Sequence, residues 1–408
     1  MKRLRRRCND GGSKKKNKDM FDDLPDCILL HILSFLDTKR AVRTCLLSTR
    51  WKDLWKRVPT LTLIYPPDPY FVSRKNLKGF SRFVSWILSN RDASTALHAV
   101  DFERTGLVEP NLLKRIVKYA VSHNVQRLRI CVKCDIQHFP SCFFSCHTLT
   151  SLDLYVGSRI YDQTTVFPNS LKLPALTSLS LHYFTFPVGD NGRAEPFSTF
   201  NRLNSLIIDN CILLDAQILC ISSATLANLT IQSISRRVNF PEIELSTPSL
   251  CTFAFYGIPF TKLSGNHLCS IKHVNIDTDT YFNCSKVELT GIPPSILLSW
   301  LIDLTHIRSL RVSSTILQVL SLVPDLLKLK LPSLCNLKTL KVKMRYVSYD
   351  LFKALIDAEL AQLPTRSHEE VAKLQEAFKV GSSSIPDGIV DFLLQNSPSA
   401  EVHIEYNE

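Results

Sequence analysis

The sequence predicts an α/β protein in which a small all-helical unit is followed by a long stack of short strands and an α/β ending. Two observations predict this order: short apolar helices crowd the region before residue 65, and a six-residue apolar pattern then recurs ten times. With 408 residues and 45% hydrophobic content, the chain has room for two or three domains with a real core. The predicted divisions are a disordered basic tail (1–19), a helical unit (20–65), a repeat region (66–330) and an ending (331–408).

The basic tail carries most of the net charge. Residues 1–18 contain nine Lys or Arg and one Asp, which gives +8 of the formal +12 and leaves +4 for the other 390 residues. This tail lacks apolar content and is predicted to be disordered. Its two basic clusters, on either side of Gly11-Gly12, fit a nuclear import signal. A solvated tail that carries no targeting signal is an equal alternative. No interleaved aromatic residues or recognition helix accompany the charge, so nucleic acid is not a predicted partner.

Cysteine usage and hydropathy predict an intracellular protein of the nucleus, the cytoplasm or both. The 13 cysteines are scattered, often inside apolar runs, as expected of small buried side chains in a reducing compartment. The longest strongly apolar run, Ser295 to Ile302, is far shorter than the roughly 20 residues that a membrane span needs, so no membrane partner is predicted. No apolar segment follows the basic N-terminus, and a secretory signal is therefore not expected.

The helical unit is predicted to contain three short helices. Leu24-Pro25 opens the first, where the missing N–H of proline costs least, and Thr38 and Ser48 are placed as N-caps of the second and third. About a dozen large apolar side chains are more than so small a unit can bury within itself, which indicates a partner surface. A capping subdomain of a larger fold is the alternative.

The segment LPDCILLHILSFLDTKRAVRTCLLSTRWKDLW closely resembles the F-box, the module that docks onto Skp-family adaptors of cullin-RING ubiquitin ligases. The similarity runs from Leu24 to Trp55 and includes the LP opening, the ILSFL core and the LSxRWxxLW ending. It implies that the following apolar residues are buried against the adaptor: Leu24, Pro25, Ile28, Leu29, Ile32, Leu33, Leu36, Val42, Leu46, Leu47, Trp51 and Leu54.

The repeat region is built from ten words of the form Φ-x-x-Φ-x-Φ. They begin at residues 97, 125, 149, 176, 203, 226, 250, 271, 307 and 337, with spacings of 21 to 36 residues. The segment CSKVEL at 284–289 is a possible extra unit. The words are similar to the leucine-rich-repeat pattern, in which the last two apolar positions point inward from a strand and neighbouring strands stack into a parallel sheet. An irregular solenoid is therefore predicted, and a βαβ fold with few strands is the alternative.

Positions that alternate with the buried pair are predicted to line the concave face of this sheet. They are polar and mixed, as on a protein-binding surface, although any solvated sheet has this appearance. The residues predicted to contact a target protein are Arg127, Arg129, Asp153, Tyr155, His182, Asp209, Tyr256, His273 and Asp277. The long connections at 157–170 and 186–199 are further candidates.

The ending is predicted to form a last repeat strand, a charged helix at 358–380, a flexible GSSS break, and then a helix, a turn and the strand EVHIEY. The segment LLQNSPSAEVHIE resembles the end of the FBD domain, which follows the repeats in a large group of plant F-box proteins. The charged insertion and Ala400 depart from that family's pattern.

We find no motif for catalysis, a metal or a cofactor. The sequence lacks GxxxxGK[ST] and GxGxxG, and position 372 is Ala, where a zinc-protease helix beginning at His368 needs its second ligand. Cys131 and Cys134, with nearby Cys142 and Cys146, have zinc-like spacing, but they continue a repeat strand and an apolar turn, so no metal site is predicted.

The resemblance implies a non-catalytic substrate receptor of a Skp–cullin–F-box ubiquitin ligase, whose partners are a Skp-type adaptor, through it a cullin, and an unknown target. The alternative is a repeat scaffold or ligand sensor without ubiquitin transfer, in which a basic pocket around Arg127 and Arg129 holds an anion. An enzymatic function is the third hypothesis.

Overall fold

The computed structural model describes most of the chain between Phe21 and Tyr406. The described ranges are Phe21 and residues 24–65, 74–134, 136–156, 165–168, 171–189, 191–233, 240–278, 294–323, 325–345 and 385–406. The basic tail, the possible unit at 284–289 and the charged helix predicted at 358–380 lie outside these ranges. In the described part, no helix is both long and apolar enough to cross a bilayer.

The helical unit contains two α-helices, α1 (Asp26–Ser34) and α2 (Thr38–Arg43), and three 3₁₀ turns. The third predicted helix is wrong in type, because Thr49–Trp51 and Leu54–Arg57 form separate 3₁₀ turns. The prediction of Thr38 as an N-cap is wrong, because Asp37 caps α2 by accepting from the backbone N–H of Arg40 at 2.8 Å. Ser48 does occupy the N-cap position of the turn Thr49–Trp51, but its side chain makes no capping hydrogen bond.

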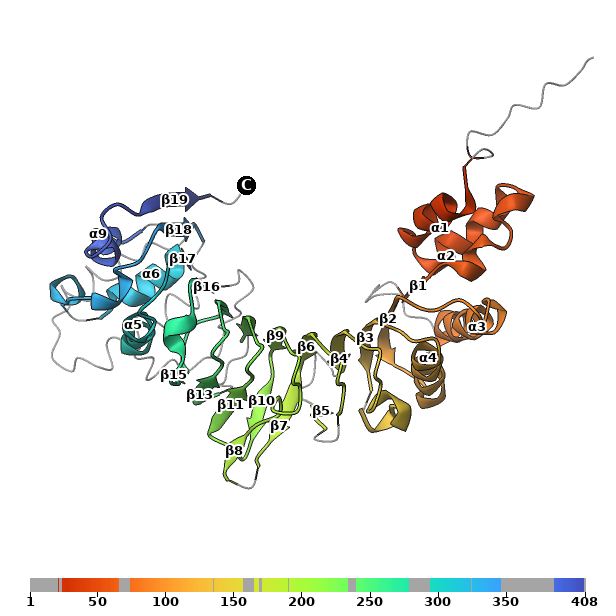
Figure 1. The fold of residues 1–408 in the computed structure, drawn as a ribbon, viewed down its shortest axis with the longest axis horizontal. Helices are drawn as coiled ribbons and strands as arrows, with labels where there is room; N and C mark the ends of the chain where they lie inside the picture. Colours follow the sequence, from red (N-terminus) through yellow and green to blue (C-terminus); the bar gives the residue numbers. More distant parts are fainter. Residues whose placement is uncertain are drawn as a thin grey trace, which may run out of the picture.

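A twelve-stranded parallel sheet runs through the rest of the molecule, with its strands in sequence order (Figure 1). Each of the ten predicted words forms one strand, and the first apolar residue of every word is at most 4% exposed. The strands are β1 (Thr60–Ile64), β2 (Ala99–Leu107), β3 (Arg127–Lys133), β4 (Ser151–Val156), β6 (Ser178–His182), β9 (Ser205–Asp209), β12 (Asn228–Gln232), β14 (Thr252–Tyr256), β16 (His273–Asp277), β17 (Ser309–Ser313), β18 (Thr339–Lys343) and β19 (Glu401–Glu405).

The sheet extends beyond the predicted repeat region at both ends. Strand β1 lies inside the range predicted for the helical unit and pairs with β2, Thr60 opposite Ala99. Strand β19 lies in the predicted ending and pairs with β18, Thr339 opposite Glu401. Both segments alternate apolar and polar residues as the ten words do, so the same parallel ladder accepts them.

The molecule is an arc with the large sheet along its inner side (Figure 1). The outer side carries two smaller parallel sheets, of three and four strands, and several helices. The outer strands are β5 (Thr165–Val166), β7 (Phe184–Pro187), β8 (Arg193–Ala194), β10 (Ile212–Leu214), β11 (Ile218–Ser222), β13 (Glu242–Ser246) and β15 (Lys262–Ser264). The helices are α3 (Arg74–Asn90), α4 (Pro110–Ser122), α5 (Pro294–Asp303), α6 (Ser314–Ser321) and α9 (Ile389–Leu394).

The core lies between the large sheet and this outer layer, as the inward positions of the words predict. Trp300 of α5 is its largest fully buried side chain, and its ring meets that of Phe255 edge-on with centroids 5.0 Å apart. The indole N–H donates to the carbonyl of Thr261 at 2.9 Å, which satisfies the one polar atom that this side chain brings inside.

The helical unit is joined to the sheet by more than the chain itself. The backbone N–H of Thr62 in β1 donates to the hydroxyl of Thr38 at 3.0 Å, and buried Arg91 donates to the carbonyl of Val58 at 2.6 Å. The rings of Trp55 and Trp86 stack with centroids 5.2 Å apart. These contacts fix the orientation of the helical unit at one end of the arc.

We expect Trp86→Ala to lower the free energy of unfolding by about 1 kcal/mol, because it removes the aromatic stack that ties α3 to the helical unit. Trp86 is half exposed, so the variant leaves no large cavity. Denaturant unfolding would measure the change, with Trp86→Phe as the control that keeps an aromatic ring. Equal stability of Trp86→Ala and wild type would contradict the expectation.

Candidate functional site

Besides Phe21, whose ring packs against that of Trp51, five large apolar side chains between the start of α1 and Leu47 are exposed to solvent. Ile28, Ile32 and Phe35 lie on one side of α1 at i, i+4 and i+7, with 43%, 36% and 76% of their surface exposed. Leu46 and Leu47, which follow α2, are 84% and 65% exposed. We call these five residues the exposed apolar surface. Exposure of so many large apolar groups on one small unit is typical of a protein–protein contact.

Four residues predicted to face an adaptor are instead inside the unit. Leu29, Leu33, Trp51 and Leu54 are at most 4% exposed, so the prediction for them is wrong. The reason is that so small a unit needs a core of its own, and the side of α1 that bears Leu29 and Leu33 provides part of it. Of the other predicted residues, Pro25 is exposed, and Leu24, Leu36 and Val42 are half-buried. Phe35 was not predicted, although its spacing from Ile28 and Ile32 indicates the exposed side.

The start of α1 is held by two arginines from the end of the unit. Arg50 donates to the carbonyl of Phe21 at 2.8 Å and also to the carbonyl of Leu24. Arg57 and Arg50 lie 2.7 Å and 3.4 Å from the carboxylate of Asp26. The hydrogen bond with Arg57 is the main cause that holds the pKa of Asp26 below its ordinary value. The LP opening is therefore fixed before any partner binds.

The parallel register places most of the predicted target-binding residues in rows across the concave face. Tyr155, His182 and Asp209 are direct neighbours on β4, β6 and β9. Arg129 and Asp153 form the neighbouring row on β3 and β4. Arg127 and His273 are exposed, and Tyr256 is half-buried. The connection at 186–199 contributes β7 and β8 to the outer side and not to this face.

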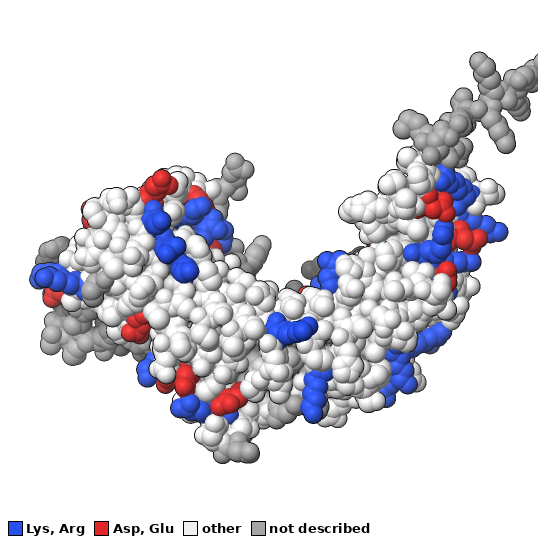
Figure 2. Space-filling view, viewed as in Figure 1, with Lys and Arg blue, Asp and Glu red and all other residues white. Residues whose placement is uncertain are grey.

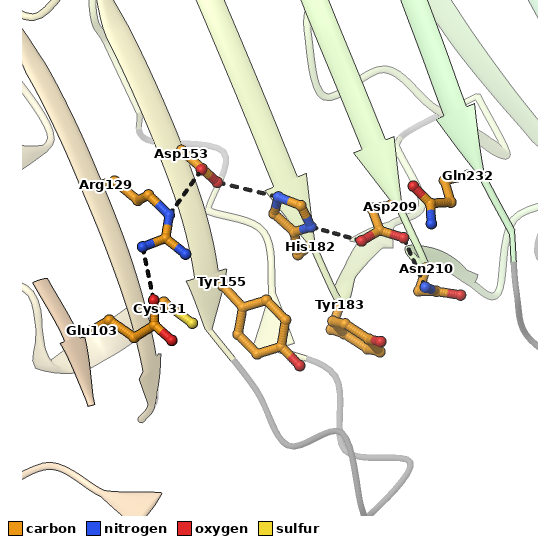
Figure 3. A pocket seen from close by; sticks show the side chains of 10 residues that line it. All are labelled: Glu103, Arg129, Cys131, Asp153, Tyr155, His182, Tyr183, Asp209, Asn210 and Gln232. Atoms are coloured by element: carbon orange, nitrogen blue, oxygen red, sulfur yellow. Dashed lines mark hydrogen bonds and ion pairs between the residues drawn. The ribbon is translucent and has the colours of Figure 1, made fainter. Parts of the chain in front are cut away.

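Five of these residues meet around a hollow of about 340 Å³ toward the carboxyl ends of β4, β6, β9 and β12, to which β2 and β3 contribute residues from their middle. Figure 3 shows Arg129, Asp153, Tyr155, His182 and Asp209 among the ten residues that line it. We call this feature the strand-end hollow.

A chain of charged contacts runs across the strand-end hollow. Arg129 Nη1 donates to Asp101 at 2.8 Å and to Glu103 at 2.9 Å, and its Nε lies 3.5 Å from Asp153. His182 lies between two carboxylates, with Nδ1 2.7 Å from Asp209 and Nε2 3.1 Å from Asp153 (Figure 3). The amide of Asn210 donates to the other oxygen of Asp209 at 2.7 Å.

These contacts shift two pKa values. Burial alone lowers the pKa of His182, but its hydrogen bonds with Asp153 and Asp209 outweigh burial and raise the pKa from 6.5 to about 9. At neutral pH the ring is therefore an imidazolium that donates from both nitrogens. Burial likewise lowers the pKa of Arg129, and the carboxylates of Asp101 and Glu103 more than reverse this, so its pKa is raised.

A basic, anion-binding pocket at Arg129 is not what the structure contains. The guanidinium is surrounded by Asp101, Glu103 and Asp153, and the strand-end hollow that it lines holds more carboxylates than cations. Arg127 is exposed and does not line this hollow. The sequence shows Arg127 and Arg129 as a basic pair because the acidic partners of Arg129 are about one repeat away along the chain.

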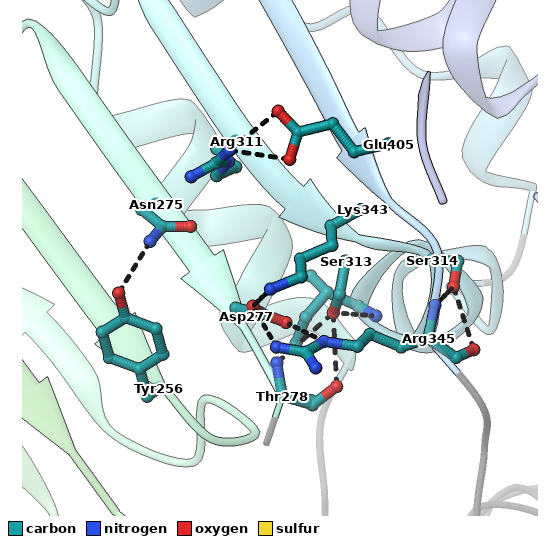
Figure 4. Close-up of polar contacts among 11 residues, drawn as sticks. Tyr256, Asn275, Asp277, Thr278, Arg311, Ser313, Ser314, Lys343, Arg345 and Glu405 are labelled. Carbon is teal, nitrogen blue, oxygen red and sulfur yellow. Dashed lines mark hydrogen bonds and ion pairs between the residues drawn. The ribbon is translucent and has the colours of Figure 1, made fainter. Parts of the chain in front are cut away.

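A second polar cluster joins the last strands of the sheet (Figure 4). Asp277 is 4% exposed and accepts from Arg345 at 3.2 Å and 2.8 Å, with Lys343 at 3.8 Å. The prediction that Asp277 contacts a target is therefore wrong, because its carboxylate is buried and already paired. Arg311 of β17 reaches across β18 and donates to both oxygens of Glu405 in β19, each at 2.7 Å. This cluster attaches the final strand.

The structure also locates the cysteines. Cys131 lines the strand-end hollow and Cys146 is buried. Among the residues described, no group of three or more His, Cys, Asp or Glu side chains could hold a metal ion. Figure 2 shows that charged side chains gather toward the two ends of the arc, with no continuous stripe of Lys and Arg on the face shown.

The fold and the exposed apolar surface define a two-part protein: a small helical docking unit attached rigidly to a curved parallel sheet. Residues 21–62 match the F-box domain family. An F-box/FBD/LRR-repeat protein of Arabidopsis thaliana is 29% identical over 229 residues, which cover 55% of this chain and 50% of that protein. A second such Arabidopsis protein is 25% identical over 94% of this chain and 85% of its own length. Arabidopsis F-box/LRR-repeat protein 13 is 24% identical over 74% of this chain and 66% of its own length. The chain resembles this plant family of F-box/FBD/leucine-rich-repeat proteins.

Proposed function

We propose that the protein is the substrate-receptor subunit of a Skp–cullin–F-box ubiquitin ligase. The exposed apolar surface of the F-box is the observation that carries the proposal. A monomer gains nothing by exposing Phe35, Leu46 and Leu47, whereas burial of each against a Skp-type adaptor would contribute about 1.5–3 kcal/mol. The adaptor would connect the chain to a cullin.

In this role the strand array is a leucine-rich-repeat solenoid with an FBD-like ending, and its concave face holds the target. The convergence of five predicted target-binding residues on the strand-end hollow supports the placement of the target there. The chain would perform no bond-making step. It would raise the local concentration of target lysines near the ubiquitin-charged enzyme, and the contacts between Trp55 and Trp86 and between Thr38 and Thr62 would keep that distance constant.

Co-expression of the full chain with a Skp-type adaptor, followed by size-exclusion chromatography, tests the proposal. We expect a stable one-to-one complex. Deletion of residues 1–65 is a poor control, because it also removes β1 and exposes the edge of β2. Point variants of the exposed apolar surface are the better control. A full chain that is folded but does not bind the adaptor would contradict the proposal and would favour a repeat scaffold that works without ubiquitin transfer.

A further inference from the structure

We propose that the strand-end hollow binds the cationic side chain of an arginine or lysine in the target protein. The inference rests on the proposed function, since it specifies what part of a target the concave face recognises. It is carried by three features of the strand-end hollow: an excess of carboxylates, an aromatic wall and a size that suits one side chain.

The charges that line the strand-end hollow favour a cation. Glu103, Asp153 and Asp209 oppose Arg129 and the imidazolium of His182, and Asp101 adds a fourth carboxylate beside Arg129. Within the described part of the chain, Glu103 uses only its Oε2, which accepts from Arg129, so Oε1 remains an open acceptor. A carboxylate oxygen can accept more than one hydrogen bond, and a guanidinium or ammonium group supplies several donors. Arg127 and Lys133 lie on the same strand as Arg129, but neither lines the strand-end hollow.

Two tyrosines give the strand-end hollow an aromatic wall. The rings of Tyr155 and Tyr183 have centroids 5.1 Å apart, and both lie beside the charged chain in Figure 3. Tyr183 directly follows β6 with a φ of +62°, a left-handed conformation that is unfavourable for so bulky a residue. Such strain persists where the surrounding structure fixes the residue in place, and here it directs an aromatic ring into a binding site. The face of a tyrosine ring attracts a cation.

The volume of the strand-end hollow indicates what kind of cation enters it. About 340 Å³ is at the small end of the range for small-molecule sites, which suits one long side chain better than a cofactor. Most of the lining residues belong to strands of the large sheet, so a protein segment that lies along the concave face would pass beside the strand-end hollow.

Titration calorimetry of the full chain with an acetylated Gly-Arg-Gly amide tests the inference. The matched probe replaces Arg with citrulline, which has the same shape and no charge. We expect the arginine peptide to bind about tenfold more tightly, since an ionised donor replaces a neutral one. Glu103→Gln should weaken binding of the arginine peptide by about the same tenfold factor. Glu401→Gln is the control, because it makes the same change on an exposed residue of β19 at the far end of the sheet.

A gain of charge gives a second, independent variant. Gln232 lines the strand-end hollow from β12, and Gln232→Glu should tighten arginine binding several-fold without removing any existing ion pair. Equal binding of the arginine and citrulline peptides, or tighter binding of a Gly-Glu-Gly amide, would overturn the inference. Equal losses in Glu103→Gln and Glu401→Gln would also overturn it.

The two proposals can fail separately. If the adaptor binds and the arginine peptide does not, the proposed function stands and the inference falls. If the arginine peptide binds and the adaptor does not, the strand-end hollow is a recognition site of a scaffold, and the ligase role falls.

Discussion

Replacing Leu46 and Leu47 with aspartate should abolish co-purification with a Skp-type adaptor while the chain stays folded. Both side chains are more than 60% exposed, so the two charges remain hydrated in the free protein and cost little stability. In a complex the same charges would be buried without partners, at a cost of about 3 kcal/mol or more. This corresponds to a loss in affinity of more than about a hundredfold, which size-exclusion chromatography of the co-expressed pair detects.

Two matched controls make this result specific. Leu327→Asp makes the same change at a leucine that is 60% exposed in the 3₁₀ turn Leu326–Lys328, between α6 and β18, and it should leave adaptor binding intact. Leu29→Asp with Leu33→Asp should instead unfold the F-box, because both side chains are fully buried. Loss of far-UV signal in that double variant, with native signal in the Leu46/Leu47 pair, would separate docking from folding. Retained adaptor binding by the Leu46/Leu47 variant would refute the assigned surface.

The strands of the large sheet could be predicted almost residue by residue. Each word contains an anchor at its first apolar position and two inward side chains, and these apolar positions have few ways to be buried other than in a stacked sheet. Strand β1 belongs to a complete word, VPTLTL at 58–63, which was overlooked because it directly follows the apolar helical unit. Strand β19 was assigned to the ending because Ser399 stands where a word has its first apolar residue. The short outer strands were not predicted either, since two to five residues carry too little periodicity.

The sequence does not distinguish the side of α1 that faces the core from the side that is exposed. Ile28, Leu29, Ile32 and Leu33 are all large and apolar, so periodicity shows a wide face without showing which part of it is core. Only packing against the rest of the unit makes the distinction. Phe35 was missed for the same reason, because it lies at the end of the apolar run.

The polar contacts depend on distances that local patterns do not contain. Asp277 looks like any concave residue, and its burial follows from Arg345, which is 68 positions later in the chain. His182 and Asp209 are one repeat apart, 27 residues, so their closeness could have been inferred from the register once the words were aligned. The same alignment of the words places three carboxylates beside Arg129. It therefore argues against an anion-binding site at this residue.

We expect the protein to lose stability as the pH rises, because His182 then releases the proton that it shares with two carboxylates. The folded pKa of about 9 lies above the ordinary value of 6.5, so between these values the native state binds a proton that the unfolded chain releases. The resulting stabilisation is complete below pH 6.5 and disappears as the pH passes 9. Because one pKa unit corresponds to about 1.4 kcal/mol, the shift is worth up to about 3 kcal/mol.

Comparison with His182→Gln isolates this contribution from every other titrating group. Glutamine cannot carry the proton and leaves Asp153 and Asp209 without their shared cation, so the variant should be less stable than wild type at pH 6.5. The difference should shrink steadily and nearly vanish above pH 9. Urea unfolding at pH 6 to 9.5 measures it, with His273→Gln as the control on an exposed histidine of the same sheet. A difference that stays constant with pH would mean that His182 stabilises the sheet as a neutral ring, and the bridge between the two carboxylates would then not be ionic.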